Sequence, residues 1–226
     1  MGEFVMLSTQ DKVPLRAYRS APTGKPRGGV VVLQEIFGVN HQICSTADRF
    51  AALGYLAIAP AVQDRAMPGF VTDDYSPAAF GRAREFIGAF KPDLAMLDIK
   101  AAVIEAAKGG KVGVTGYCFG GMLTWRAAAD ASMGLSAASG YYGGGVPNYI
   151  DVAPQIPTEM HFGDQDAGIP VEQVEQLRAR YPNVPIYLYG ADHGFFNDER
   201  TRTFDAAAAT VAFARTAEFF AHHLAG

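Results

Sequence analysis

The stretch KVGVTGYCFGGMLTWRAAADA, residues 111–131, decides the fold class and raises the question of chemistry. An apolar, strand-like run ends at Tyr117, and a helix-like run begins directly after the turn that follows. At the turn the sequence reads G-x-C-x-G, with Cys118 between Gly116 and Gly120. This strand–turn–helix pattern is typical of a nucleophile held on a sharp turn, where serine is the commoner residue.

The residue types around Cys118 suit a nucleophile for physical reasons. The backbone of such a turn is strained, so small residues two positions before and after it let the strand and helix approach. The turn sets the sulfur at a helix N-terminus, whose dipole favours a thiolate, and aims the amide of Phe119 at an oxyanion. The alternatives are a tight turn with a buried cysteine or a phosphate loop, although a G-x-G-x-x-G loop needs glycine at position 118.

Strand-like and helix-like segments alternate along the chain, which predicts an α/β fold with a mostly parallel central sheet and helices on both faces. The polar-alternating segments 3–9 and 13–20 predict an antiparallel pair at the N-terminal edge of that sheet. Further strands are expected at residues 28–34, 55–60, 111–117, 135–142, 158–163 and 185–190. Helices are expected around residues 41–53, 93–108, 119–131, 171–180 and 203–224.

The helix around 93–108 carries apolar residues at helical spacing, and we expect its buried face to lie away from Asp98 and Lys100. The residues expected on that face are Leu94, Leu97, Ala101 and Ile104. No internal repeat, low-complexity tract or long linker occurs, so residues 1–226 are expected to form a single domain.

Composition narrows the classes of function. The chain has a net charge of −4 and so no excess of basic residues, which means that nucleic acid is not an expected partner. The sequence has no apolar stretch long enough to span a bilayer, and its N-terminus does not resemble a signal peptide. We therefore expect a cytoplasmic protein without a membrane partner, whose two cysteines, Cys44 and Cys118, remain free thiols.

A thiol nucleophile needs a base, and His193 is the expected one. It lies in the loop ADHGFF after a predicted strand, and it follows the nucleophile in chain order. The other histidines have sufficient structural explanations. His41 begins a helix or lies at the surface, and His161 is a core residue of a strand. His222 and His223 lie in the last turns of the final helix.

The group that orients the base should follow a strand between positions 118 and 193. The segment HFGDQDAGIP offers Asp164 and Asp166, and we expect Asp166 because Asp164 is placed to cap the turn. Asp192 is a weaker rival, since the side chains of adjacent residues diverge.

Glu35 ends a very apolar run, VVLQEIFG, where its carboxylate would be costly to bury without a partner. We expect it beside the thiol, with the amide of Ile36 as the second oxyanion donor; the alternative is a loop glutamate in a surface ion pair.

Taken together, these motifs resemble the dienelactone hydrolases (carboxymethylenebutenolidases), a cysteine-using branch of the α/β-hydrolase fold. The resemblance covers nearly the whole chain and rests on five segments: QEIFG at 34–38, GYCFGG at 116–121, YYG at 141–143, GDQDAGIP at 163–170 and ADHGF at 191–195.

The resemblance implies a Cys118–His193–Asp166 triad that opens a small lactone through an acyl-enzyme. Dienelactone would give maleylacetate, a reaction of aromatic degradation. The glutamate that matches Glu35 is implied to interact with the resting thiol and to help deprotonate it when substrate arrives. A permanently exposed thiolate would invite oxidation, which fits this role.

The substrate-binding residues depart from the family pattern. One of the two arginines that hold the substrate carboxylate aligns with Arg82, with Arg84 close by, although either is equally explained as a solvated helix residue. The other arginine falls on Asn197, which supplies no charge. Arg200 and Arg202 are possible substitutes, and Phe37 and Tyr142 are further expected substrate-binding residues.

We therefore expect a small-molecule lactone or ester as substrate; the alternative is an uncharged aryl or alkyl ester or a thioester, which Asn197 favours. A non-catalytic binding protein is the least expected of the three readings. The sequence shows neither metal-site spacing nor a Walker loop, so no metal and no cofactor is expected, and the protein is expected to be a monomer.

Overall fold

The structure, a computed structural model, describes residues 2–225 as two compact units, residues 2–112 and 113–225. The first unit contains the strands β1 (Glu3–Ser8), β2 (Pro14–Ser20), β3 (Gly29–Leu33) and β4 (Leu56–Pro60), and the helices α1 (His41–Ala52), α2 (Pro77–Ala89) and α3 (Pro92–Ala106). The second contains the strands β5 (Val112–Tyr117), β6 (Ala137–Tyr141), β7 (Thr158–Gly163) and β8 (Ile186–Tyr189), and the helices α4 (Phe119–Ala128), α5 (Val171–Arg180) and α6 (Ala206–His223). Short 3-10 turns cover Ala107–Gly109, Ala131–Met133 and Val146–Tyr149.

The four strands of the first unit lie in the order β1-β2-β4-β3. The edge strand β1 pairs with β2 antiparallel, with Glu3 opposite Arg19, which confirms the predicted N-terminal pair. β2 continues antiparallel to β4, and β3 runs parallel to β4. Both β3 and β4 are buried along their whole length, as their continuous apolar sequences predict. α1 and α3 pack against these two strands.

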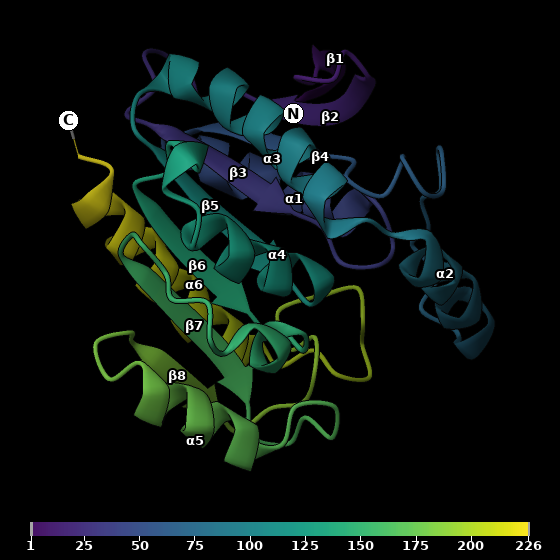
Figure 1. The fold of residues 1–226 in the computed structure, drawn as a ribbon, viewed down its shortest axis with the longest axis vertical. Helices are drawn as coiled ribbons and strands as arrows, with labels where there is room; N and C mark the ends of the chain where they lie inside the picture. The colour runs from purple at the N-terminus through teal and green to yellow at the C-terminus, as the bar shows by residue number, and fades with distance from the viewer. Residues whose placement is uncertain (1, 226) are drawn as a thin grey trace. The chain divides into compact units, whose positions relative to one another are not determined.

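The four strands of the second unit lie in the order β5-β6-β7-β8 and are all parallel. Their helices cover both faces. The hydroxyl of Ser139 on β6 lies 2.7 Å from that of Thr216 on α6, whereas the next residue, Gly140, faces Gly121 of α4. Because successive strand residues point to opposite faces, α4 and α6 lie on opposite sides of β6 (Figure 1).

This parallel arrangement brings the carboxyl ends of β5 to β8 to one edge of the sheet, where ligands of such folds bind. Four chemically distinctive segments follow those ends. They begin at Cys118, Tyr142, Asp164 and Gly190. Each of the predicted strands of this unit is found, with β7 covering the predicted residues 158–163.

The predicted buried face of α3 is only partly confirmed, since Ala101 is buried but Ile104 is not. Ile104 is 61% exposed, and Asp98 is fully buried instead. Asp98 is tolerated inside because Arg65 donates hydrogen bonds to both of its carboxylate oxygens, at 2.8 to 3.0 Å. The buried stripe therefore includes Asp98, and its centre follows Ile99 and Ala102 rather than Ile104.

Helix α2 was not among the helices expected from periodicity, since only Ala79, Ala83 and Phe86 of its residues are buried. Its start signal is nonetheless in the sequence, because Ser76 caps the helix and Pro77 occupies its first turn. α6 begins after the expected position, at Ala206. The reason is Asp205, whose carboxylate accepts a hydrogen bond from the amide of Ala208 at 2.8 Å.

Candidate active site

Cys118 occupies the turn between β5 and α4 in a backbone conformation that few L-residues adopt. Its φ is +54° and its ψ is −112°, and it stands at the N-cap of α4. Its amide donates to the carbonyl of Tyr141 at 3.0 Å, and its carbonyl accepts from the amide of Gly121 at 3.0 Å. The strained conformation predicted for a nucleophile turn is therefore present, and the sulfur lies at the positive end of a helix.

Two glycines allow this turn by close approach. A Cβ on Gly116 would overlap the carbonyl of Gly120, so the strand and the helix touch through backbone alone. A Cβ on Gly121 would overlap the carbonyl of Tyr141 at the end of the neighbouring strand β6. The glycines thus let α4 start directly above β5 and β6, which holds position 118 at the sheet edge.

Asp166 and His193 are brought together from the loops after β7 and β8. The Nδ1 atom of His193 donates to Oδ2 of Asp166 at 2.6 Å. The carboxylate is buried and its second oxygen, Oδ1, accepts the amide of Gly168 at 2.8 Å. Because both oxygens are held, the carboxylate fixes the ring orientation and leaves Nε2 for chemistry.

The groups around His193 change its pKa in opposite directions. Burial by itself lowers the pKa of this imidazole, whose side chain is 26% exposed. The negative sulfur of Cys118 and the hydrogen bonds with Asp166 and Cys118 outweigh burial and raise the pKa from 6.5 to about 10. The imidazole is therefore set up to carry a proton at neutral pH.

The two rival carboxylates lie elsewhere. Asp164 and Asp192 are both exposed. The carboxylate of Asp192 accepts the amide of His193 at 2.6 Å, so it caps the backbone of the loop and not the ring. Of the three acids, Asp166 is the one that is hydrogen-bonded to the imidazole ring.

Gly168 contacts Asp166 through its backbone, a support that was not predicted from the sequence. Its amide holds Asp166 across two residues, an arrangement that the pattern D-x-G signals, because an aspartate side chain readily accepts the amide two positions later. Tyr142 and Asn197 are both fully buried. The ring of Tyr142 lies 5.1 Å from that of His193, and its φ of +35° marks a second tight turn; Asn197 uses its side-chain oxygen to accept the amide of Glu199 at 3.1 Å.

Other predicted residues belong to the first unit. Glu35 and Ile36 are buried, with Glu35 only 2% exposed. Phe37 is buried between the rings of Tyr75 and Phe80, in edge-to-face contacts of 4.9 and 4.8 Å. These residues form the loop directly after β3, as predicted.

Arg82 projects from the exposed side of α2. Its guanidinium carbon lies 5.8 Å from the ring centre of Phe70, and both residues line a hollow of about 540 Å³ between α2 and the loop that precedes it. Arg84 is exposed as well but does not line this hollow. Of the two arginines, Arg82 is the one that lines this hollow.

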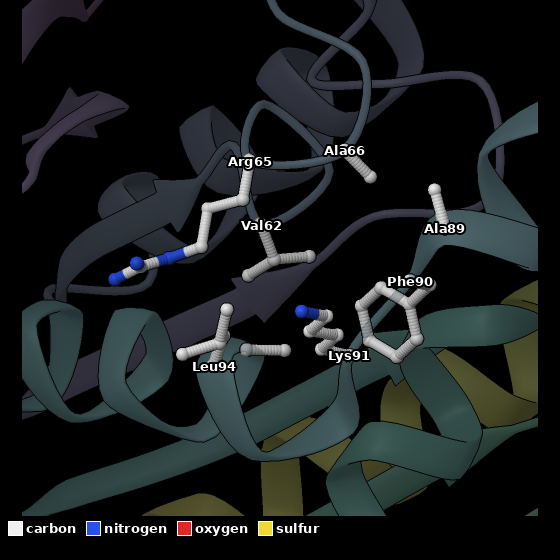
Figure 2. A pocket seen from close by; sticks show the side chains of 8 residues that line it. Val62, Arg65, Ala66, Ala89, Phe90, Lys91 and Leu94 are labelled. Atoms are coloured by element: carbon white, nitrogen blue, oxygen red, sulfur yellow. The ribbon is translucent and has the colours of Figure 1, made fainter.

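A second pocket, of about 290 Å³, lies beside the junction of α2 and α3 (Figure 2). Val62, Phe90 and Leu94 give it an apolar lining, and Lys91 lies between the last two. The guanidinium of Arg65 is directed away from Phe90, toward Asp98. No nucleophile or histidine lines this pocket, so it does not have the groups for acyl transfer.

His161 is a core residue, as the sequence argument expected. It is fully buried in β7, with Nδ1 at 2.8 Å from the hydroxyl of Tyr189 and Nε2 at 3.1 Å from Glu159. Among residues 2–225, no three His, Cys, Asp or Glu side chains are grouped in a way that would hold a metal ion. Across the same residues, no helix has the length and apolar character needed to cross a membrane.

Comparison with known proteins assigns the family. A model of the dienelactone hydrolase family matches residues 15–224, nearly the whole chain. The chain belongs to this family. A "Putative carboxymethylenebutenolidase" of Synechocystis sp. (strain ATCC 27184 / PCC 6803 / Kazusa) is 34% identical over 211 residues, which is 84% of each chain. "Carboxymethylenebutenolidase 1" of Cupriavidus pinatubonensis is 31% identical over 214 residues, covering 91% of this chain and 90% of that protein.

The fold agrees with the family. The crystal structure of a "Putative Dienelactone Hydrolase" from Klebsiella pneumoniae has a TM-score of 0.84 to this chain, with 28% identity and 98% of both chains covered. The expected α/β-hydrolase fold is therefore confirmed, and the dienelactone hydrolase family makes this chain a carboxylic ester hydrolase.

Proposed function

We propose that this dienelactone hydrolase family member opens a small lactone or ester with a Cys118–His193–Asp166 triad through an acyl-enzyme. The observation that carries the proposal is the strained turn at Cys118 together with an imidazole whose pKa is raised to about 10 by that sulfur and by Asp166. A cysteine on this turn, paired with a protonated histidine, has the two groups that thiol-based acyl transfer requires.

The reaction proceeds in two halves. In the first, the Cys118 thiolate attacks the carbonyl carbon, the carbon–oxygen bond of the ester breaks, and His193 gives its proton to the leaving oxygen. In the second, neutral His193 takes a proton from water, the hydroxide attacks the thioester, and the thiolate leaves. One water is consumed, and the enzyme returns to its starting state.

The negative charge on the oxygen of the tetrahedral intermediate needs hydrogen-bond donors. We assign this role to the amides of Phe119 and Ile36. The amide of Phe119 begins α4 and so lies at the positive end of that helix, and the loop after β3 is the usual source of the second donor in this fold.

Glu35 is proposed to assist the thiol when substrate binds, as the family resemblance implies. Support comes from its almost complete burial at the end of β3, because a buried carboxylate is costly unless it has a role or a partner. We expect Glu35→Gln to lower kcat/KM by about 10²-fold, the usual size of a proton-transfer contribution. Glu85→Gln, an exposed glutamate on α2, is the matched control. Equal activity of the two variants would remove Glu35 from the mechanism.

The substrate class is proposed to be a lactone that bears a carboxylate, such as dienelactone, whose opening gives maleylacetate in aromatic degradation. Relatives named carboxymethylenebutenolidase support this choice, and Arg82 beside its hollow supplies a positive charge. The second candidate, hydrolysis of uncharged aryl or alkyl esters or of thioesters, is favoured by the buried, uncharged Asn197.

A substrate panel separates the two candidates. We expect kcat/KM for cis- or trans-dienelactone to exceed that for an uncharged aryl ester, and Arg82→Ala to lower only the dienelactone value, by about 10-fold or more. Arg84→Ala is the control, since Arg84 lies off the hollow. If the neutral ester is turned over well while dienelactone is not, the substrate assignment fails and the hydrolase chemistry remains.

We also propose that the protein works in the cytoplasm as a monomer, without nucleic acid or membrane. Two free cysteines and a net charge of −4 support this proposal. Light scattering of the purified protein and cell fractionation test it, and a stable dimer or a membrane-bound pool would contradict it.

A further inference from the structure

A buried carboxylate that the hydrolytic steps do not use lies in the core of the second unit. Glu159, on β7, is only 1% exposed. Its Oε1 accepts hydrogen bonds from the hydroxyls of Ser139 and Thr216, at 2.9 and 3.0 Å, and lies 3.1 Å from Nε2 of His161. Burying a carboxylate costs stability unless several donors surround it, so this carboxylate organises the groups around it.

The first branch of this network runs to the strand that precedes the histidine loop. Arg215 on α6 donates to the hydroxyl of Tyr189 at 3.0 Å, and that hydroxyl lies 2.8 Å from Nδ1 of His161. Since a guanidinium only donates and a carboxylate only accepts, Arg215 is the donor at one end of this branch and Glu159 the acceptor at the other, with Tyr189 and His161 between them.

The second branch runs to the strand that supports Cys118. The hydroxyl of Tyr141 lies 2.7 Å from Oγ1 of Thr216, which in turn donates to Glu159. Thr216 has a single proton, so Tyr141 must be the donor to it. The carboxylate of Glu159 is thus the final acceptor for both branches, and it orients the side chains of Tyr141 and Tyr189 together.

Each tyrosine connects directly to a reacting segment. The carbonyl of Tyr141 accepts the amide of Cys118 at 3.0 Å, which anchors the strained turn. Tyr189 ends β8, and its ring lies 5.2 Å from that of Phe195, two residues beyond His193. One buried carboxylate is therefore connected, through these two tyrosines, to both the Cys118 turn and the His193 loop.

We propose that Glu159 is a positioning residue for the hydrolytic reaction, which holds the Cys118 turn and the His193 loop in register through Tyr141 and Tyr189. The inference rests on the proposed function and deepens it. Small displacements of reacting groups are costly in rate, so a rigid connection between the two segments affects turnover more than substrate binding.

The test compares two tyrosines on one strand. Tyr189→Phe removes only the hydroxyl that links the network to β8. Tyr187→Phe is the matched control, because Tyr187 lies on the same strand and stacks on His161 at 5.2 Å, while its hydroxyl belongs to neither branch. We expect Tyr189→Phe to lower kcat by about 10-fold with KM within about twofold of wild type, and Tyr187→Phe to leave both unchanged.

A second readout separates positioning from general loss of structure. The rate at which iodoacetamide alkylates Cys118 is measured against pH in the absence of substrate. We expect the profile of Tyr189→Phe to move to higher pH, because a displaced His193 supports the thiolate less well, and that of Tyr187→Phe to match wild type.

Glu159→Gln tests the buried carboxylate itself. It keeps the volume but presents amide protons to groups that already donate, so we expect a larger loss of kcat and a larger shift of the alkylation profile than for Tyr189→Phe. If this variant does not fold, the comparison of Tyr189→Phe with Tyr187→Phe still tests the positioning role. Identical kcat and alkylation profiles for Tyr189→Phe and Tyr187→Phe would overturn the positioning role. A wild-type Cys118 of ordinary reactivity would instead overturn the proposed function.

Discussion

Replacing Cys118 by alanine will lower kcat/KM for ester and lactone substrates by about 10⁴-fold or more, because the covalent route is lost and only bound water can attack. The fold should survive, since alanine is smaller than cysteine and the glycines that allow the turn are unchanged. Steady-state rates with an activated ester, together with a circular dichroism spectrum that matches wild type, check this expectation.

Cys44 supplies the matched control. It lies on α1, half-buried, and burial together with the carboxylates of Asp48 and Asp73 raises the pKa of its thiol to about 12. Cys44→Ala should therefore keep wild-type activity, and Cys44 should resist alkylation at neutral pH. Ester hydrolysis at the wild-type rate by Cys118→Ala would end the proposal of a cysteine nucleophile.

Asp166→Asn should lower kcat by about 10³- to 10⁴-fold, because the amide no longer holds the imidazole in the tautomer and orientation that leave Nε2 free. Asp164→Asn is the matched control, as Asp164 lies in the same turn, is exposed, and has no hydrogen bond to His193. Loss of activity in both variants alike would mean that the turn and not the carboxylate is what matters.

The pKa of His193 gives the same variant a second readout. Its folded-state value of about 10 lies above the ordinary 6.5, so the stability that the imidazolium contributes is full below pH 6.5 and disappears as pH rises through 10. Asp166 is one cause of that elevation, so the titration of His193, followed by NMR, should move below 10 in Asp166→Asn. Thermal unfolding temperatures should then depend less on pH across this window. An unchanged titration would contradict the assigned hydrogen bond.

The strand and turn at residues 112–121 could be predicted from sequence because their chemistry is local. Gly116 and Gly121 are required by close backbone contacts, and the apolar run before Cys118 has no other explanation than a buried strand. Asp166 could be chosen over Asp164 by its place in the turn, although the support from Gly168 was seen only in the structure.

Other features depended on partners far away in sequence. Asp98 looks like a surface residue until Arg65, 33 residues earlier, is found donating to it, and this pairing rotates the buried face of α3 away from Ile104. The role of Glu159 depends likewise on Thr216, 57 residues later. Periodicity carries no information about such pairs, because it treats every charged residue as exposed.

The most direct test of the proposed mechanism is to detect the acyl group covalently bound to Cys118. The enzyme is mixed with an excess of activated ester, quenched in acid within the first turnover, digested and analysed by mass spectrometry. If Cys118 is the nucleophile, the peptide that contains it gains the mass of the acyl group, and this species disappears as product forms. Product formation in a burst with Cys118 unmodified, or with the acyl group on another residue, would contradict it.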